Sequence, residues 1–100
     1  MRNKELYYTI DALLRGCQVF HGKDMENFIT FRTGGIETKF IFAHEDLRIV
    51  TSRTDYGRIT YLAPMVRVKY EDIVCVYLNW KMDLNIETTT DCLEFALLDF

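Results

Sequence analysis

The sequence has few of the features that mark interdomain linkers, membrane spans or disulfide bonds. Proline occurs once, at Pro64, and glycine five times in 100 residues, so we expect one domain, over 1–100, without a linker. Apolar runs stay well short of the roughly 20 residues that cross a bilayer. The cysteines are odd in number and widely spaced (Cys17, Cys75 and Cys92). This pattern predicts buried free thiols in a reducing compartment, and hence a soluble cytoplasmic protein that does not contact a membrane.

Residue patterns typical of catalysis are equally scarce. His44-Glu45-Asp46 has ligand-type side chains, but the segment reads as a turn and has no second ligand pair at metal spacing. Cys17 lies near His21 in sequence, yet thiol catalysis also needs an orienting group. Gly34-Gly35 is not followed by the Lys-Ser/Thr of a phosphate loop. We therefore predict a protein that is not an enzyme and has no cofactor and no metal.

Alternation of apolar and polar residues is the main pattern that is present. Hydrophobic residues make up 49% of the chain and aromatic residues 14%, enough for a core without metals or disulfides. Residues 80–87 alternate without a break, with Trp80, Met82, Leu84 and Ile86 on one side. Residues 36–43 repeat the pattern. A period of two residues is that of a β-strand, so the chain is predicted to form mainly sheet.

Turn residues divide the chain into short elements. Asn3 and Gly16 bracket a predicted helix, although 6–10 is also rich in strand-forming residues. Gly34-Gly35 predicts a tight hairpin between strands over 27–33 and 36–43, with a short helix over 24–32 as the weaker alternative. Further strands are expected over 18–20, 47–52, 58–63, 66–70, 73–79 and 80–87.

The end of the chain supports two alternatives. Residues 91–94 have the spacing of a helical capping box, which predicts a short C-terminal helix reaching Phe100. Residues 93–97 also alternate, which indicates a final strand almost as well.

Together these elements predict an α+β domain. We expect an N-terminal helix followed by a strongly bent antiparallel sheet or small barrel of five to seven strands, with the short C-terminal helix as an option. Residues 65–76 combine two strand-like runs with the intervening pair Glu71-Asp72. This run resembles the strand, short turn and strand that close Sm-like and SH3-like barrels. The resemblance covers about a tenth of the chain and implies a barrel-like fold.

The net charge of −3 hides an uneven distribution. Residues 47–70 carry five basic side chains against Asp55 alone, whereas residues 71–100 carry seven acidic side chains against Lys81. A basic middle is therefore followed by an acidic end. Opposite charges within one chain, together with unpaired sheet edges, also indicate self-association as a symmetric dimer.

The leading hypothesis is a small non-catalytic binding protein that acts through protein–protein contacts. Aromatic and acidic side chains of the last third of the chain are its predicted binding residues: Tyr77, Trp80, Asp83, Glu87 and Glu94. Compact acidic proteins of this kind are common among inhibitors encoded by viruses or mobile elements. By that analogy we expect an inhibitor of a nucleic-acid-binding machine, of the anti-defence type.

The alternative hypothesis is a small-barrel module, Sm-like or SH3-like, that binds nucleic acid or a nucleotide. Arginine binds phosphate through two hydrogen bonds, and tyrosine offers a face on which bases stack. The predicted anion-binding residues lie in the basic stretch: Arg48, Arg53, Tyr56, Arg58, Tyr61 and Arg67. The competing structural explanation is that these arginines pair across strands with acidic residues.

Overall fold

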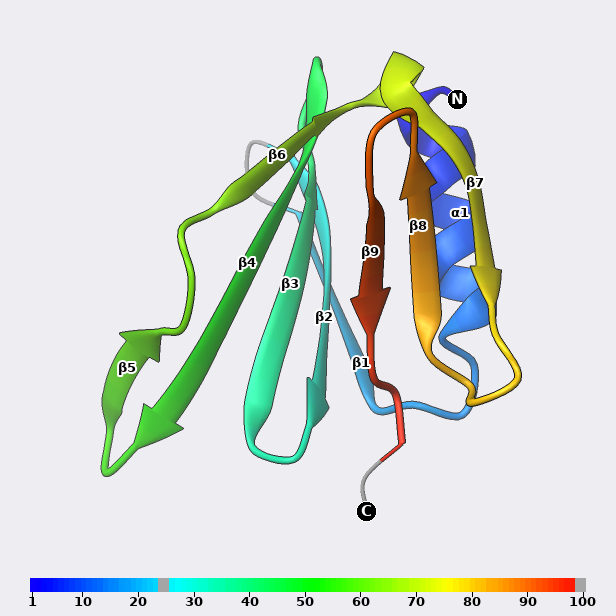
Figure 1. Ribbon diagram of the computed structural model, residues 1–100. Coiled ribbons are helices and arrows are strands. Elements are labelled where there is room, and N and C mark those ends of the chain that lie inside the picture. Colours follow the sequence, from blue (N-terminus) through cyan, green and yellow to red (C-terminus); the bar gives the residue numbers. More distant parts are fainter. Residues whose placement is uncertain (24–25, 99–100) are drawn as a thin grey trace.

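The computed structural model describes residues 1–23 and 26–98 and shows an α+β fold (Figure 1). One helix precedes nine strands, and a 3₁₀ turn, η1, separates β6 from β7. The elements are α1 (Asn3–Leu13), β1 (Val19–Lys23), β2 (Asn27–Thr33), β3 (Ile36–Phe42), β4 (Asp46–Asp55), β5 (Arg58–Tyr61), β6 (Val66–Lys69), η1 (Tyr70–Asp72), β7 (Ile73–Leu78), β8 (Leu84–Thr88) and β9 (Cys92–Phe95). The predicted class and N-terminal helix are confirmed. Neither α1 nor η1 has the length and apolar character needed to cross a membrane, and no other helix occurs in these ranges.

The strands are antiparallel, as predicted, but they form two open sheets instead of one strongly bent sheet or small barrel of five to seven strands. Sheet A has the order β1-β2-β3-β4-β5, and β6 pairs with the first part of β4 while β5 pairs with its end. Sheet B has the order β7-β8-β9. The predicted strand, short turn and strand over 66–78 do form, but β7 pairs only with β8 among the described residues. Because η1 sends β7 into a separate sheet, the barrel prediction is wrong.

The hairpin at Gly34-Gly35 is confirmed. Thr33 pairs with Ile36, and the two glycines have φ of 59° and 80°, which is the left-handed conformation that a tight two-residue hairpin turn requires. Residues 24 and 25, where the alternative helix would begin, lie outside the described residues. Asn27–Thr33 is a strand, so the hairpin prediction was the better one.

The unbroken alternation over 80–87 gives a strand only in its second half. The side-chain Oδ1 of Asn79 accepts hydrogen bonds from the N–H groups of Lys81 (2.9 Å) and Asp83 (3.0 Å), and Met82 has φ of 64°. This loop leaves Trp80 87% exposed and delays the start of β8 until Leu84. Trp80 and Met82 are therefore surface residues, whereas the alternation had grouped them with the buried Leu84 and Ile86.

The predicted C-terminal helix is wrong as far as Leu98, the last described residue. A tight turn forms instead, in which the N–H of Thr88 donates to the carbonyl of Asp91 (2.8 Å) and the N–H of Asp91 donates to Oγ1 of Thr88 (2.9 Å). The turn sends the chain back as β9, which confirms the alternative strand. Asp99 and Phe100 lie outside the described residues.

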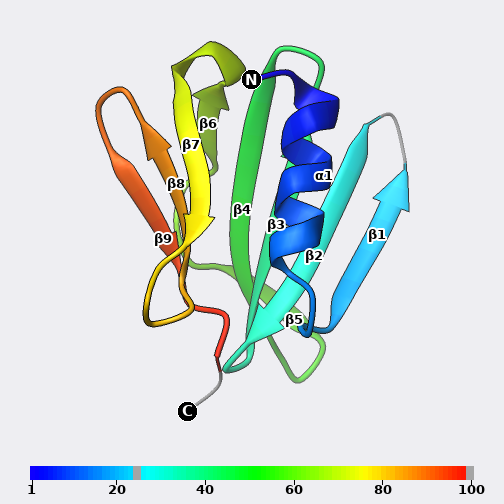
Figure 2. The same cartoon turned by 90° about the vertical axis from the view of Figure 1, so that its right-hand side faces the viewer.

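The core lies between sheet A and a second layer in which α1 and sheet B stand side by side (Figure 2). Leu6 and Ile10 of α1 are fully buried, as the helical periodicity predicted. Phe40 of β3 stacks on Phe31 at 5.7 Å between ring centroids and meets the ring of Phe95 edge-on at 5.2 Å. Burial of each such side chain contributes about 1.5–3 kcal/mol. The buried cluster has no member between residues 50 and 67, so the end of β4 and all of β5 extend beyond the core.

Candidate interaction surface

Residues 53–67, which we call the arm, form a continuous exposed segment. It comprises the end of β4, β5, the loop to β6 and the first two residues of β6, and all fifteen residues are exposed. The β4–β5 hairpin points away from sheet B and α1 (Figure 1). Six large apolar side chains are among the exposed ones: Tyr56, Ile59, Tyr61, Leu62, Met65 and Val66. An exposed apolar patch of this kind is typical of a binding surface.

The arm is held by strand pairing and not by burial. Tyr56 and Gly57 form the turn between β4 and β5 with φ of 51° and 77°, and Asp55 pairs with Arg58 across it. A left-handed conformation is uncommon for a tyrosine, and the side chain of Tyr56 is fully exposed, so packing does not explain its presence there. The tip of the arm thus presents an aromatic ring to solvent.

The arginines of the arm carry uncompensated charge. Arg53, Arg58 and Arg67 form no ion pair with any residue that the structure describes. By contrast, Nε of Arg48 donates to Oδ1 of Asp46 at 3.0 Å, which compensates the charge of Arg48. Arg48 is therefore paired, but with a residue of its own strand, β4, and not across strands as the structural explanation expected. Among the described residues, that explanation fails for the other three arginines.

Strand register separates the six predicted anion-binding residues. Arg48 pairs with Arg67, and Tyr61 pairs with Ser52, which places Arg48, Tyr61 and Arg67 on the face of sheet A opposite the core. Arg53 and Arg58 lie on the other face of the hairpin, and Tyr56 lies at its tip. The sequence grouped these residues by proximity along the chain, and the structure brings only part of the group together.

A groove runs beside the arm between β6 and β9. Two adjoining cavities of about 270 Å³ and 280 Å³ share Val66 and Leu93. Ile49, Ala63 and Pro64 line the second cavity, giving it apolar walls. Within the described residues, β6 pairs only with β4 and β9 only with β8, so both strands present an unpaired backbone edge. Such edges are ready to pair with another chain.

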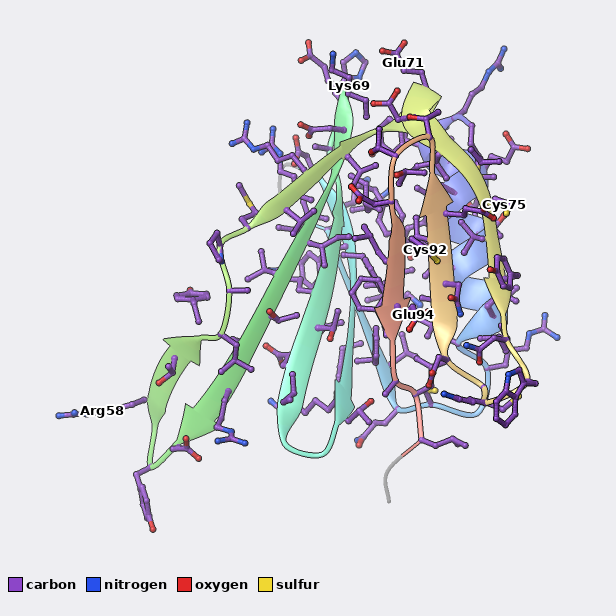
Figure 3. The ribbon with its side chains drawn as sticks, viewed as in Figure 1. Arg58, Lys69, Glu71, Cys75, Cys92 and Glu94 are labelled. Atoms are coloured by element: carbon purple, nitrogen blue, oxygen red, sulfur yellow. The ribbon has the colours of Figure 1, made fainter. Side chains whose placement is uncertain are left out.

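The outer face of sheet B gathers three of the five residues predicted to bind a protein. Register aligns Cys75, Glu87 and Cys92 across the sheet, and Tyr77, Asn85 and Glu94 in the next row. Tyr77, Glu87 and Glu94 are exposed there, whereas Trp80 and Asp83 lie in the loop between β7 and β8. Cys92, Glu94 and Cys75 are labelled in Figure 3. These five residues therefore border one acidic surface.

The thiols are free, as predicted, but they are not buried. Cys92 is exposed, and Cys17 and Cys75 are half-buried. The Sγ of Cys75 donates to Oε2 of Glu87 at 3.1 Å, and this hydrogen bond to the carboxylate raises the pKa of Cys75. The predicted burial of Cys75 is wrong because the register of β7 shifts between Ile73 and Cys75, which places Cys75 opposite the exposed Glu87.

The other polar clusters show no arrangement typical of catalysis. Nε2 of His21 lies 2.6 Å from Oδ1 of Asp11, but both side chains are nearly half exposed. His44 and Asp46 lack a third side chain with which to bind a metal ion. In residues 1–23 and 26–98, no group of three His, Cys, Asp or Glu side chains is placed to hold one. A cavity of about 760 Å³ near η1 mixes Arg2 with acidic residues and Lys69. Lys69 and Glu71 mark its position in Figure 3.

Comparison with protein families, curated proteins and solved structures found no match to this chain. Functional inference therefore depends on the surface itself. Sequence reasoning missed Ile59, Leu62, Met65 and Val66 as surface residues. For Leu62, Met65 and Val66, the available signal was the loss of strict alternation over 62–66, a stretch that contains Pro64.

Proposed function

We propose that this is a small non-catalytic binding protein that acts through protein–protein contacts, and that the arm and the adjoining groove receive the partner. The observation that carries the proposal is the run of fifteen exposed residues with six large apolar side chains. Tyrosine and arginine together are typical anchors of protein interfaces. The arm combines Tyr56 and Tyr61 with three arginines that form no ion pair in the described chain.

A purely structural role for the arm does not account for its composition. A connection between β4 and β6 needs turn residues, and exposed polar side chains serve that purpose without cost. Ile59 and Tyr61 are 61% and 68% exposed, so they contribute little of the burial that stabilises the fold. Removing such side chains from water yields about 25 cal/mol per Å² of apolar surface. That gain becomes available only when a partner covers the arm.

A photo-crosslinking amino acid at position 61 tests the proposal in the native host. Position 8 is the matched control, because Tyr8 on α1 is 67% exposed, nearly the same as Tyr61, and lies outside the arm. We expect a discrete protein adduct from position 61, resistant to nuclease, and none from position 8. Position 80 reports separately on the predicted role of Trp80. Absence of a position-61 adduct, or equal labelling from both tyrosine sites, contradicts the proposal.

The alternative function, nucleic-acid binding, has one observation in its favour. Arg48, Tyr61 and Arg67 share the uncovered face of sheet A, where Nζ of Lys39 also lies 4.1 Å above the ring centre of Phe28. Basic and aromatic side chains on an open sheet can bind single strands. The same crosslinker at position 61 discriminates, because an adduct removed by nuclease supports this alternative. The inhibitor role stays a prediction.

A further inference from the structure

The arm and sheet B carry charges of opposite sign. Arg53, Arg58 and Arg67 against Asp55 give the arm a net charge of +2. Over 73–98, which covers sheet B and its loops, four acidic residues against Lys81 give −3. The acidic residues are Asp83, Glu87, Asp91 and Glu94. The two surfaces stand on either side of the groove (Figures 1 and 3), and the arm points away from sheet B. Each surface is therefore complementary to the other and remains available to another molecule.

Both surfaces also expose apolar side chains. On the face of the arm that carries Arg53 and Arg58, these are Leu62 and Val66, which lie beside Thr51 and Ile49 of β4. On sheet B and its loop they include Val74, Trp80 and Met82. Their presence on both sides means that contact between an arm and a sheet B buries apolar area and also pairs opposite charges. Apolar burial supplies affinity, while charge supplies steering and orientation.

We propose that the partner of the arm is a second copy of this chain. The two copies pair about a two-fold axis that runs along the groove, so that each arm covers the outer face of sheet B of the other copy. Because the arm and sheet B flank the groove, rotation by 180° about such an axis exchanges them. The contact is then reciprocal and closed. This inference rests on the proposed function and names the partner within it.

The available surface is of the size that a stable dimer needs. A standard interface buries about 800 Å² on each partner. That is roughly a tenth of the 6984 Å² exposed by the described chain. The fifteen exposed arm residues and the five accessible residues of the outer face of sheet B (Cys75, Tyr77, Glu87, Cys92 and Glu94) total 20 on each copy, which is the lower end of the roughly 20–30 residues per side that such interfaces use.

Reciprocal charge reversal tests the pairing. We expect the unaltered protein to be a dimer in analytical ultracentrifugation at about 50 mM salt, and its dissociation constant to rise with salt. The variant R53E/R58E has an acidic arm and an acidic sheet B, whereas E87R/E94R has a basic arm and a weakly basic sheet B. The dimer dissociation constant of each variant should be about 100-fold higher than that of the unaltered protein. An equal mixture should restore dimers that contain one copy of each variant, because both arm–sheet contacts then join opposite charges.

Controls separate a specific contact from general charge effects. The variant K4E/R15E makes the same change in charge on exposed residues in or beside α1 and should keep the dimer. If E87R/E94R does not fold by circular dichroism, E87Q/E94Q replaces it, and the dissociation constant should rise about tenfold. A monomeric unaltered protein at millimolar concentration overturns the inference. So does a dimer indifferent to both reversals, or a mixture that stays monomeric.

The two proposals fail in distinguishable ways. A monomeric protein whose position 61 crosslinks to a different protein leaves the proposed function intact and removes only the dimer. A monomeric protein without any protein adduct at position 61 removes both. A position-61 adduct with the mass of two copies supports both.

Discussion

Tyr70→Phe removes one hydroxyl from the turn that separates the two sheets. Tyr70 lies in η1, is 9% exposed, and donates a 2.6 Å hydrogen bond from its hydroxyl to the carbonyl of Ala43. The phenylalanine variant keeps the ring and leaves that buried carbonyl without its donor. An unsatisfied buried group of this kind costs about 1–2 kcal/mol. We expect the free energy of unfolding at pH 7 to fall by that amount, measured by urea denaturation.

The pH dependence gives this prediction a second, independent test. Burial, and next the carboxylate of Asp46, raise the pKa of Tyr70 above the ordinary value of about 10. Above pH 10 the unfolded chain therefore loses a proton that the folded protein keeps, and the unaltered protein loses stability as pH rises. The variant lacks this group. The difference between the two proteins should shrink by about 1.4 kcal/mol between pH 8 and pH 11.

Tyr61→Phe is the matched control, since Tyr61 is 68% exposed and the change removes the same hydroxyl group. We expect it to change the free energy of unfolding by less than about 0.5 kcal/mol at pH 7. A difference between unaltered protein and Tyr70→Phe that stays constant through pH 11 would show that Tyr70 ionises as readily in the folded protein as in the unfolded chain. A difference below about 0.5 kcal/mol at pH 7 would refute the hydrogen-bond argument itself.

Two further predictions concern the uncovered face of sheet A and the arm. A Cβ built on Gly22 overlaps the ring of Phe28, so Gly22→Ala should lower the free energy of unfolding by about 1–3 kcal/mol. In a Phe28→Ala background the same substitution should cost much less, which urea denaturation of the four proteins would show. Equal costs in both backgrounds would contradict the contact between Gly22 and Phe28. If the alternative function is correct, phosphate contacts from Arg48 and Arg67 give a log–log salt slope of about −1.4 on single-stranded DNA. The variant R48A/R67A should lose this slope, and a slope that it leaves unchanged excludes those two arginines.

Features set by neighbours in sequence were predictable. The turn at Gly34-Gly35 needs only local backbone freedom, and Leu6 and Ile10 recur at helical spacing, so both elements form where expected. The strand, turn and strand over 66–78 also follow from short-range pattern. Each of these predictions depends on residues within about one turn or one strand of each other. Charge segregation likewise needed only a count along the chain.

Features set by distant pairing were not predictable. The barrel prediction is wrong because β4 pairs with β6 at one end and with β5 at the other, and no local sequence pattern indicates this pairing. The groove depends on Val66 and Leu93 coming together across 27 positions. The alternation over 80–87 predicted a full strand, but the side chain of Asn79 accepts two backbone hydrogen bonds. These hydrogen bonds hold residues 80–83 in a loop. Local sequence patterns predicted most of the individual elements, whereas long-range strand pairing determines which of their faces are exposed.

The arm contains both apolar residues that favour indiscriminate strand pairing and charged residues that oppose it. An exposed edge strand with apolar side chains is prone to pair indiscriminately with other chains, and charged side chains along the edge are a common protection. Arg53, Arg58 and Arg67 supply that protection here, since they repel any surface that is also basic. In the dimer proposed above, the same three charges favour the acidic, partly apolar surface of sheet B of the second copy. Under that proposal, one distribution of charge both prevents indiscriminate pairing and selects the partner.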